Sequence, residues 1–348
     1  MRDVVQHLIE TLERGGTALA CQVLETRGST PQKAGAIMAV DLNGGQVGTL
    51  GGGCVEAEVK QLAIRQLDEP GVGLHSFVLD HDDAWADGLV CGGRMLVATE
   101  ALRGERSLDY YRALAEALDR GEGFTEGVVV DPARVPGAAV GRRALFGRDG
   151  RPFAGEPWEG PGPTPLEERP RPRVSGGVAW LPSSPRVRLV IVGAGHVGQA
   201  VAALAADTDF DVWVVDDRAR FASRERFPAA HELIVGPIGA TLDALDVGPD
   251  TFLLIVTRGH GHDQEALAHA APTAAGYVGM IGSRRKIRMI FEALKGQGIS
   301  DEALARVNAP VGLDIGSRTV PEIAVSIVAE LIARRNLGPR ADRGTRTP

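Results

Sequence analysis

The chain has 348 residues, enough for two domains of ordinary size, and its 44% hydrophobic and 24% charged residues are typical of a soluble globular protein. The formal net charge of −7 argues against nucleic acid or an acidic membrane surface as a partner. No stretch approaches the roughly 18 continuous apolar residues of a membrane span, the first residues do not read as a signal peptide, and three cysteines do not predict a disulfide framework. We expect a cytoplasmic protein.

The first 150 residues predict helices and strands without a regular repeat. Apolar residues at helical spacing indicate a first helix, which two glycines end at residues 15–16. The later elements are expected in this order: strands over 17–25 and 36–40, a hairpin turn at Asn43-Gly44, a helix after residue 54, strands over 74–80 and 94–100, a helix over about 107–120 and a strand over 127–130. This mixture predicts an α+β domain over residues 1–150.

Residues 151–185 have a different composition. Seven prolines lie between Pro152 and Pro172, among glycines and acidic residues. Such a composition disfavours helix and sheet, so we predict an extended, semi-rigid linker between two domains. The last residues, 338–348, contain no apolar anchor and are expected to be disordered.

Residues 186–337 alternate buried strands with helices. A continuous apolar strand runs into a glycine turn, an alanine-rich helix and a second strand, and further short apolar runs follow at 232–236, 251–257 and 277–282. Buried strands that alternate with helices indicate a parallel sheet covered on both faces. We therefore predict an α/β protein whose second domain is a Rossmann-like, doubly wound parallel sheet.

Gly193, Gly195 and Gly198 match the pattern G-x-G-x-x-G between a strand and a helix, with His196 inside the turn. In such a turn the first glycine makes the bend, the second lets the backbone approach a phosphate, and the third lets helix and strand pack closely. Asp216 ends the next strand, where a carboxylate would accept hydrogen bonds from a ribose diol and repel a 2′-phosphate. The turn holds either a nucleotide or another phosphorylated ligand, or it serves only as a scaffold.

Two further stretches follow later strands of the same sheet. His260, His262 and Asp263 could bind a metal ion or a phosphate, or Asp263 could cap the next helix, and we assign no metal site there. Ser283 is expected to be an N-cap, and Arg284 behind it opposes the helix dipole, which indicates either a nearby anion or an ordinary solvated surface. We count His260, Ser283 and Arg284 among the candidate cofactor-binding residues.

Two thiols in the first half lie beside glycine runs. Cys54 follows three glycines (51–53) at the start of a predicted helix, and Cys91 precedes two more glycines. A helix N-terminus stabilises a thiolate, which favours nucleophilic chemistry and binding of soft metals. The alternative is that both are small residues in tight turns. Cys21, inside an apolar strand, is predicted to be core.

Assembled in chain order, these motifs resemble the XdhC/CoxI family, accessory factors that mature molybdenum hydroxylases such as xanthine dehydrogenase. The resemblance spans nearly the whole chain and rests on ETRGSTPQKAGAIMAV, GTLGGGCVEAEV, LVCGGRMLVATE, LVIVGAGHVGQA, TRGHGHD, YVGMIGSRRK and VGLDIGSRTVPEIAVSIVAEL. The chain departs from the family pattern at Leu181, where we expect an acidic residue, and in its proline-rich insertion.

The resemblance implies a chaperone that binds the molybdenum cofactor (molybdopterin), protects it while sulfur replaces an oxo ligand, and passes it to the apoenzyme of a molybdenum hydroxylase. A cysteine desulfurase is a further expected partner. Cys54 and Cys91 would be the reactive thiols, and the backbone of Gly51, Gly52 and Gly53 would face the anionic pterin. The glycine turn of the second domain would hold a phosphate, either of the pterin or of NAD or another nucleotide.

Two other functions compete with a chaperone that is not itself an enzyme. In an NAD-dependent oxidoreductase the second domain would hold the dinucleotide, with Arg258, His260 and Arg284 near the substrate, although no hydride-transfer site is evident. A nucleotide-sensing regulatory module would bind its ligand without chemistry.

We expect a homodimer. An apolar stripe on the last predicted helix is either core or the dimer seam, and it consists of Ile323, Ala324, Ile327 and Leu331.

Overall fold

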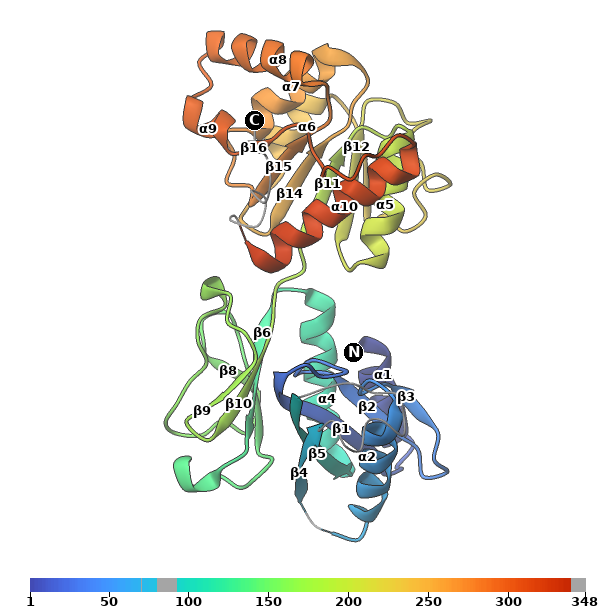
Figure 1. The fold of residues 1–348 in the computed structure, drawn as a ribbon, viewed down its shortest axis with the longest axis vertical. Helices are drawn as coiled ribbons and strands as arrows, with labels where there is room; N and C mark the ends of the chain where they lie inside the picture. Colours follow the sequence, from blue (N-terminus) through green and yellow to red (C-terminus); the bar gives the residue numbers. More distant parts are fainter. Residues whose placement is uncertain (70, 80–92, 339–348) are drawn as a thin grey trace. The chain divides into compact units, whose positions relative to one another are not determined.

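The computed structural model describes residues 1–69, 71–79 and 93–338. The chain divides into two compact units, Met1–Pro185 and Arg186–Pro348. The first contains two antiparallel sheets, and the second contains one parallel sheet with helices on both faces (Figure 1). This architecture confirms the predicted fold class. Cys91 and residues 339–348 lie outside the described residues.

The first sheet has the strand order β3-β2-β1-β5-β4. Its strands are β1 (Ala18–Gly28), β2 (Ile37–Val40), β3 (Gln46–Gly48), β4 (Val72–Leu79) and β5 (Gly93–Leu102). Successive residues of β1 point to opposite faces. Leu19 and Cys21 pack with α2 (Gly53–Arg65), whereas Ala18 and Ala20 pack with α1 (Arg2–Glu13) and α4 (Gly104–Arg120). Period-2 alternation along one strand thus builds two separate cores.

The second sheet has the order β8-β7-β6-β10-β9. Its strands are β6 (Phe124–Val129), β7 (Arg143–Phe146), β8 (Pro152–Gly155), β9 (Arg173–Ser175) and β10 (Val178–Ser183), with short 3₁₀ helices η1 (Pro132–Arg134) and η2 (Leu166–Glu168) between them. Three of these strands lie in the segment predicted as a linker, so that prediction is wrong. Proline is tolerated at strand starts and at sheet edges, and β8 and β9 are the two edge strands, with Pro152 the first residue of β8.

A buried polar cluster joins the two sheets of the first unit. Glu126 on β6 accepts hydrogen bonds from Gln22 on β1 (2.6 Å), from the Tyr110 hydroxyl on α4 (2.7 Å) and from Arg143 on β7 (2.9 Å). The Arg143 and Glu126 side chains are only 8% and 7% exposed. Arg143 Nε also donates to Glu100 on β5 at 3.2 Å. Each charge therefore depends on its partners, because neither has access to bulk water.

The sheet of the second unit has the order β13-β12-β11-β14-β15-β16, with every neighbouring pair parallel. Its strands are β11 (Arg188–Val192), β12 (Asp211–Asp216), β13 (Glu232–Val235), β14 (Thr251–Ile255), β15 (Tyr277–Met280) and β16 (Val307–Asn308). Its helices are α5 (His196–Asp207), α6 (Ile238–Ala244), α7 (Gly259–Ala270), α8 (Arg284–Gly296), α9 (Asp301–Ala305) and α10 (Val320–Leu337). On β11, Leu189 and Ile191 pack toward α5 and α10, and Val190 and Val192 pack toward α6, α7 and α8.

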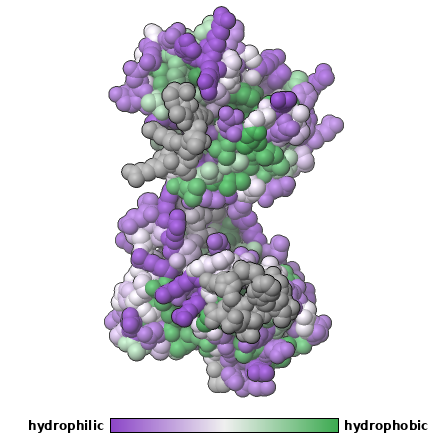
Figure 2. All heavy atoms as spheres, in the orientation of Figure 1, coloured by the Kyte–Doolittle hydropathy of each residue, from purple (hydrophilic) through white to green (hydrophobic). Residues whose placement is uncertain are grey.

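Helix α10 carries the apolar stripe that the sequence predicts to be either core or dimer seam, and the stripe is buried. Ala324, Ile327 and Leu331 are fully buried in the core shared with α5, and Ile323 packs against that core. The other side of α10 keeps apolar side chains exposed, including Val325 at 50% (Figure 2). The stripe is therefore core. Among the described residues, no helix has the length and apolar character needed to span a bilayer.

The buried cluster gives a stability prediction. Replacing Glu126→Ala should lower the free energy of unfolding of the first unit by about 3 kcal/mol, because Arg143 loses its most buried counter-charge. Hydrogen exchange of the β6 and β7 amides measures this loss. Glu116→Ala removes an exposed pair with Arg120 on α4 and should leave exchange unchanged. Equal effects of the two variants would contradict the assignment.

Candidate functional site

Cys54 lies in the first turn of α2, and its side chain is exposed. The helix begins at Gly53, and Gly52 is its N-cap. The sequence predicted this position for the thiol. The N–H groups of a first helical turn have no acceptor within the helix, and the helix dipole favours negative charge there.

Glu56, in the same turn of α2, binds the loop that precedes the helix. Its Oε2 accepts hydrogen bonds from the Thr49 hydroxyl (2.6 Å) and from the backbone N–H groups of Leu50 (2.8 Å) and Gly52 (3.1 Å). Gln46 Nε2 donates to Oε1 at 2.8 Å. Burial raises the pKa of this carboxyl, but the hydrogen bonds outweigh burial and lower the pKa to about 2. Glu56 is therefore ionised at neutral pH.

The path of the chain explains the three consecutive glycines. Gly51, Gly52 and Gly53 have φ angles of 109°, 75° and 69°, a region that residues with a side chain rarely adopt. A Cβ on Gly51 would also lie 2.5 Å from the Cβ of Pro31. The glycines thus let the chain turn tightly against a neighbouring segment immediately before Cys54.

The amides of this loop are bound by the loop itself. The Gly51 N–H donates to the Thr49 hydroxyl at 3.0 Å, and the Gly52 N–H donates to Glu56. The sequence predicted that the backbone of Gly51, Gly52 and Gly53 faces an anionic ligand. In the structure the Gly51 and Gly52 amides donate to Thr49 and Glu56, and for Gly53 the contact stays a prediction. What the segment presents outward is the thiol of Cys54 at the start of a helix.

The other thiols differ from Cys54. Cys21 is completely buried in β1, and burial raises the pKa of its thiol to about 12. This confirms that Cys21 is a core residue. Cys91 lies outside the described residues, so its predicted role beside Cys54 stays a prediction.

In the second unit, the turn between β11 and α5 uses each of its glycines differently. A Cβ on Gly193, whose φ is 116°, would lie 2.6 Å from the Val256 carbonyl oxygen, and a Cβ on Gly198 would lie 2.2 Å from the Gly193 carbonyl oxygen. Gly195, the N-cap of α5, has no heavy atom within 4 Å of its Cβ position. The outer glycines serve packing, and Gly195 leaves open space where a ligand could approach the backbone. His196 beside it is exposed.

Asp216 closes the other side of this turn. Its Oδ2 accepts the Ala194 N–H at 2.7 Å, and its carboxylate binds the Arg218 guanidinium through Nε (2.7 Å) and Nη2 (2.9 Å). Burial raises the pKa of Asp216, and the bonds from Arg218 and Ala194 outweigh it and lower the pKa. The predicted acceptor for a ribose diol is therefore engaged by the protein's own cation.

The loop after β12 gathers two guanidinium groups around one ring. The guanidinium carbon of Arg218 lies 3.8 Å and that of Arg226 lies 5.0 Å from the centre of the Phe221 ring. Arg226 Nη2 also donates to the Ala194 carbonyl at 3.2 Å and to Gln199 at 3.0 Å. These contacts hold the loop against the glycine turn.

The predicted residues that follow β14 and β15 have different surroundings. Asp263 is completely buried within α7, where its carboxylate accepts the Thr257 hydroxyl at 2.5 Å and pairs with Lys286 of α8. It does not cap α7, whose N-cap is Arg258. Ser283 is the N-cap of α8 and accepts the Lys286 N–H, as predicted. His260 and Arg284 are exposed.

Comparison with known proteins adds to this geometry. Residues 189–331 match the model described as the XdhC Rossmann domain, and residues 11–77 match the model of the XdhC and CoxI family. The two matches together cover more than half of the chain and include both glycine turns. The chain belongs to the XdhC and CoxI family.

Relatives of this family member align along most of its length. It is 29% identical to a protein of Escherichia coli named "Uncharacterized protein YqeB" over 91% of this chain, but it spans only 43% of that relative's length. It is 28% identical to a probable xanthine dehydrogenase subunit of Bacillus subtilis (93% of this chain, 95% of the relative). It is 25% identical to "Molybdenum cofactor insertion chaperone PaoD" of E. coli (96% and 88%).

A solved structure described as a xanthine dehydrogenase from Bacillus halodurans has the same fold. It superposes with a TM-score of 0.78 at 26% identity, over 97% of each chain. The arrangement of elements within the two units is therefore shared within the family.

The sequence did not predict the partners of Glu56, Arg218 and Lys286, although it placed Glu56 near the Cys54 thiol and Lys286 in the first turn of its helix. Each is a charged side chain whose role is a hydrogen bond to a buried or backbone group. For Glu56 a signal was present, because an acidic residue in the first turn of a helix often accepts N–H groups near the N-cap. The partner of Lys286 on α8 is fixed by packing against α7, whereas Arg218 binds Asp216 two positions before it in the chain.

The pKa of Glu56 gives a pH-dependent prediction. Because the folded pKa of about 2 lies below the usual 4.5, the stabilisation is fully present above pH 4.5 and is lost as the pH falls through 2. Glu56→Gln should cost about 2 kcal/mol at pH 7, and the difference from wild type should shrink on acidification below pH 4.5. Urea unfolding followed by circular dichroism at pH 7, 4 and 3 measures the difference.

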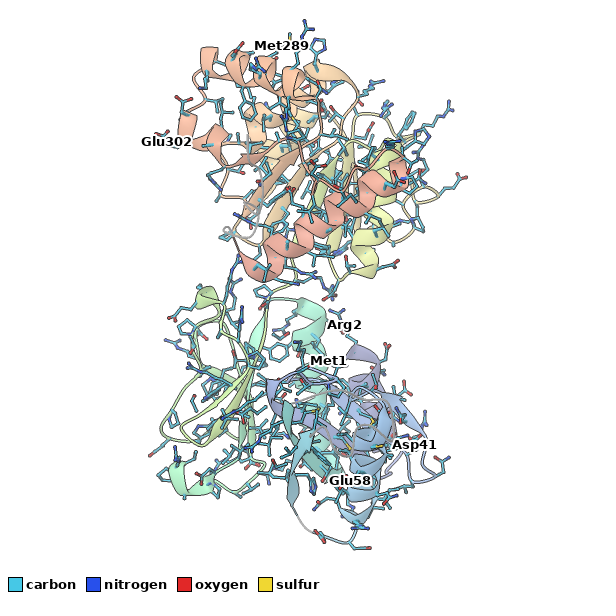
Figure 3. All side chains as sticks on the ribbon, in the orientation of Figure 1. Met1, Arg2, Asp41, Glu58, Met289 and Glu302 are labelled. Atoms are coloured by element: carbon cyan, nitrogen blue, oxygen red, sulfur yellow. The ribbon has the colours of Figure 1, made fainter. Side chains whose placement is uncertain are left out.

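The matched control is Glu58→Gln, on the exposed side of α2 (Figure 3). It should not change the urea midpoint. A difference between wild type and Glu56→Gln that stayed constant from pH 7 to 3 would contradict the role of the carboxylate.

Alanine should destabilise the second unit at one position of the second glycine turn and be tolerated at another. Gly198→Ala should destabilise the second unit by about 2 kcal/mol, because the new Cβ meets the Gly193 carbonyl. Gly195→Ala, at φ −74° in open space, should fold with unchanged stability. Hydrogen exchange of α5 measures both effects, and a loss for Gly195→Ala as large as for Gly198→Ala would contradict this assignment.

Proposed function

We propose that this chain binds the molybdenum cofactor and takes part in its delivery to a molybdenum hydroxylase of the xanthine dehydrogenase type. Membership of the XdhC and CoxI family supports the proposal, as do relatives named for xanthine dehydrogenase and for molybdenum cofactor insertion. The cofactor is the cargo of this protein. It is received, held and handed on.

The observation that carries the proposal is the exposed Cys54 thiol at the start of α2. A thiolate is a soft ligand suited to molybdenum. The helix N-terminus favours the thiolate, while the Glu56 carboxylate in the same turn works against it. Glu56 fixes the loop that leads into the helix, so the thiol is held on a rigid segment. These residues fit a metal-bearing anionic cargo.

The second contact that we propose is at the glycine turn of the second unit. Gly195 leaves the N-terminus of α5 open, and such a helix end binds phosphate through its N–H groups. We assign this turn to a phosphate group, that of the pterin cargo or of a nucleotide. His196, His260, Ser283 and Arg284 are then candidates for further contacts with the ligand.

The finer steps belong to the same proposal. While the cofactor is bound, sulfide replaces one oxo ligand of molybdenum, and the oxygen leaves as water. The sulfide comes from the persulfide of a cysteine desulfurase, which a thiol reductant reduces by two electrons. Cys54, with Cys91, handles the cofactor during this exchange. The recipient is the apoenzyme of the hydroxylase, and the carrier acts as a homodimer in the cytoplasm.

Molybdenum retention tests the proposal. Full-length wild type mixed with purified cofactor should keep about one molybdenum per chain through ultrafiltration, and Cys54→Ala should lose at least about nine-tenths of it, because the metal–thiolate bond is gone. The control is Cys21→Ala, which removes the buried thiol and should retain molybdenum like wild type. Full retention by Cys54→Ala would move the site elsewhere, and no retention by wild type would overturn the carrier function.

A further inference from the structure

The carboxylate of Asp216 accepts hydrogen bonds from four donors of the chain itself. Oδ1 accepts the backbone N–H (3.0 Å) and Nε (2.7 Å) of Arg218. Oδ2 accepts the Ala194 N–H (2.7 Å) and Arg218 Nη2 (2.9 Å). A carboxylate offers about four lone-pair sites, so four donors fill it.

The four donors divide into two kinds. The backbone N–H groups of Ala194 and Arg218 hold one site on each oxygen and fix the orientation of the carboxylate. The guanidinium takes the remaining site on each oxygen. Two adjacent donors that reach two oxygens of one carboxylate are also what the two hydroxyls of a vicinal diol provide. The side chain of Arg218 thus occupies the place of a ribose diol.

Arg218 is held in this place from several sides. Its guanidinium stacks on Phe221, and its Nε lies 3.4 Å from a carboxylate oxygen of Asp217. The Asp216 side chain is only 4% exposed, which strengthens a bidentate pair. A diol that displaced the guanidinium would have to break a charge-assisted pair to form neutral hydrogen bonds, so the exchange is unfavourable.

We propose that Arg218 determines the ligand specificity of the glycine turn because it occupies the Asp216 carboxylate, where a ribose diol would otherwise bind. The turn then binds phosphorylated ligands without a contact to a ribose 2′-hydroxyl. The ligand class is a phosphate ester that brings no vicinal diol to Asp216, as a phosphorylated pterin does. The inference shares with the proposed function the phosphate at Gly195. Its test measures nucleotide binding and is independent of molybdenum retention by Cys54.

The test compares ADP with 2′-deoxy-ADP on the full chain by titration calorimetry. Both carry the same diphosphate, and they differ only in the 2′-hydroxyl. Wild type should bind both weakly and with equal Kd. Arg218→Gln, which keeps both backbone donors to Asp216, should prefer ADP by tenfold or more, because a hydrogen bond to a carboxylate becomes available.

Three further variants serve as controls for this test. Arg220→Gln removes an exposed arginine of the same loop and should keep the two Kd values equal. Asp216→Asn combined with Arg218→Gln should abolish the preference for ADP. If Arg218→Gln does not fold, Arg218→Lys carries the test, because one ammonium group cannot bridge both oxygens and a two- to tenfold preference for ADP is expected.

Three results would overturn the inference. The first is a wild type that already prefers ADP tenfold. The second is an Arg218→Gln variant, or Arg218→Lys in its place, that binds the two nucleotides equally. The third is an Asp216→Asn, Arg218→Gln double variant that keeps the preference for ADP.

Discussion

A carboxylate that accepts backbone N–H groups of a glycine turn is the interaction on which both halves of this protein depend. Glu56 holds the loop before α2, and Asp216 holds the turn between β11 and α5. Glycines allow the chain to follow these paths, but they also increase the conformational entropy that the chain loses on folding. A buried anion with several N–H donors fixes the path that the glycines permit. The position of each turn then fixes the direction in which the following helix, α2 or α5, begins.

The two carboxylates leave different groups for a ligand. In the first unit the amides of Leu50, Gly51 and Gly52 are used by the loop itself, so a thiol and a helix start remain. In the second unit Asp216 binds the turn through the Ala194 amide, and the space at Gly195 stays open. A soft ligand for a metal and a backbone site for a phosphate are different chemistries. Each unit therefore offers a ligand a different kind of contact.

The sequence could predict those features that neighbouring residues determine. The apolar run of β11, the glycine fingerprint and the cap at Ser283 all depend on residues close together in the chain. It could not predict β8, β9 and β10, because a proline-rich segment becomes a strand only where a neighbouring strand offers an edge. Nor could it predict that Arg218 binds Asp216. Although the two are separated by one residue, Phe221 and the Ala194 amide fix that geometry from other segments.

Neutralising Asp216 also matters for the sign of the charge at the glycine turn. A buried carboxylate without a counter-ion, bonded to the turn's own amide, would oppose any phosphate that approached Gly195. With Arg218 bound across both oxygens, the Asp216–Arg218 pair has no net charge, so Asp216 does not cancel the attraction of an anion to the helix N-terminus of α5. A carrier must also release what it binds. A glycine turn that binds a phosphate without contacting sugar hydroxyls makes fewer contacts with its ligand. The ligand should therefore dissociate faster.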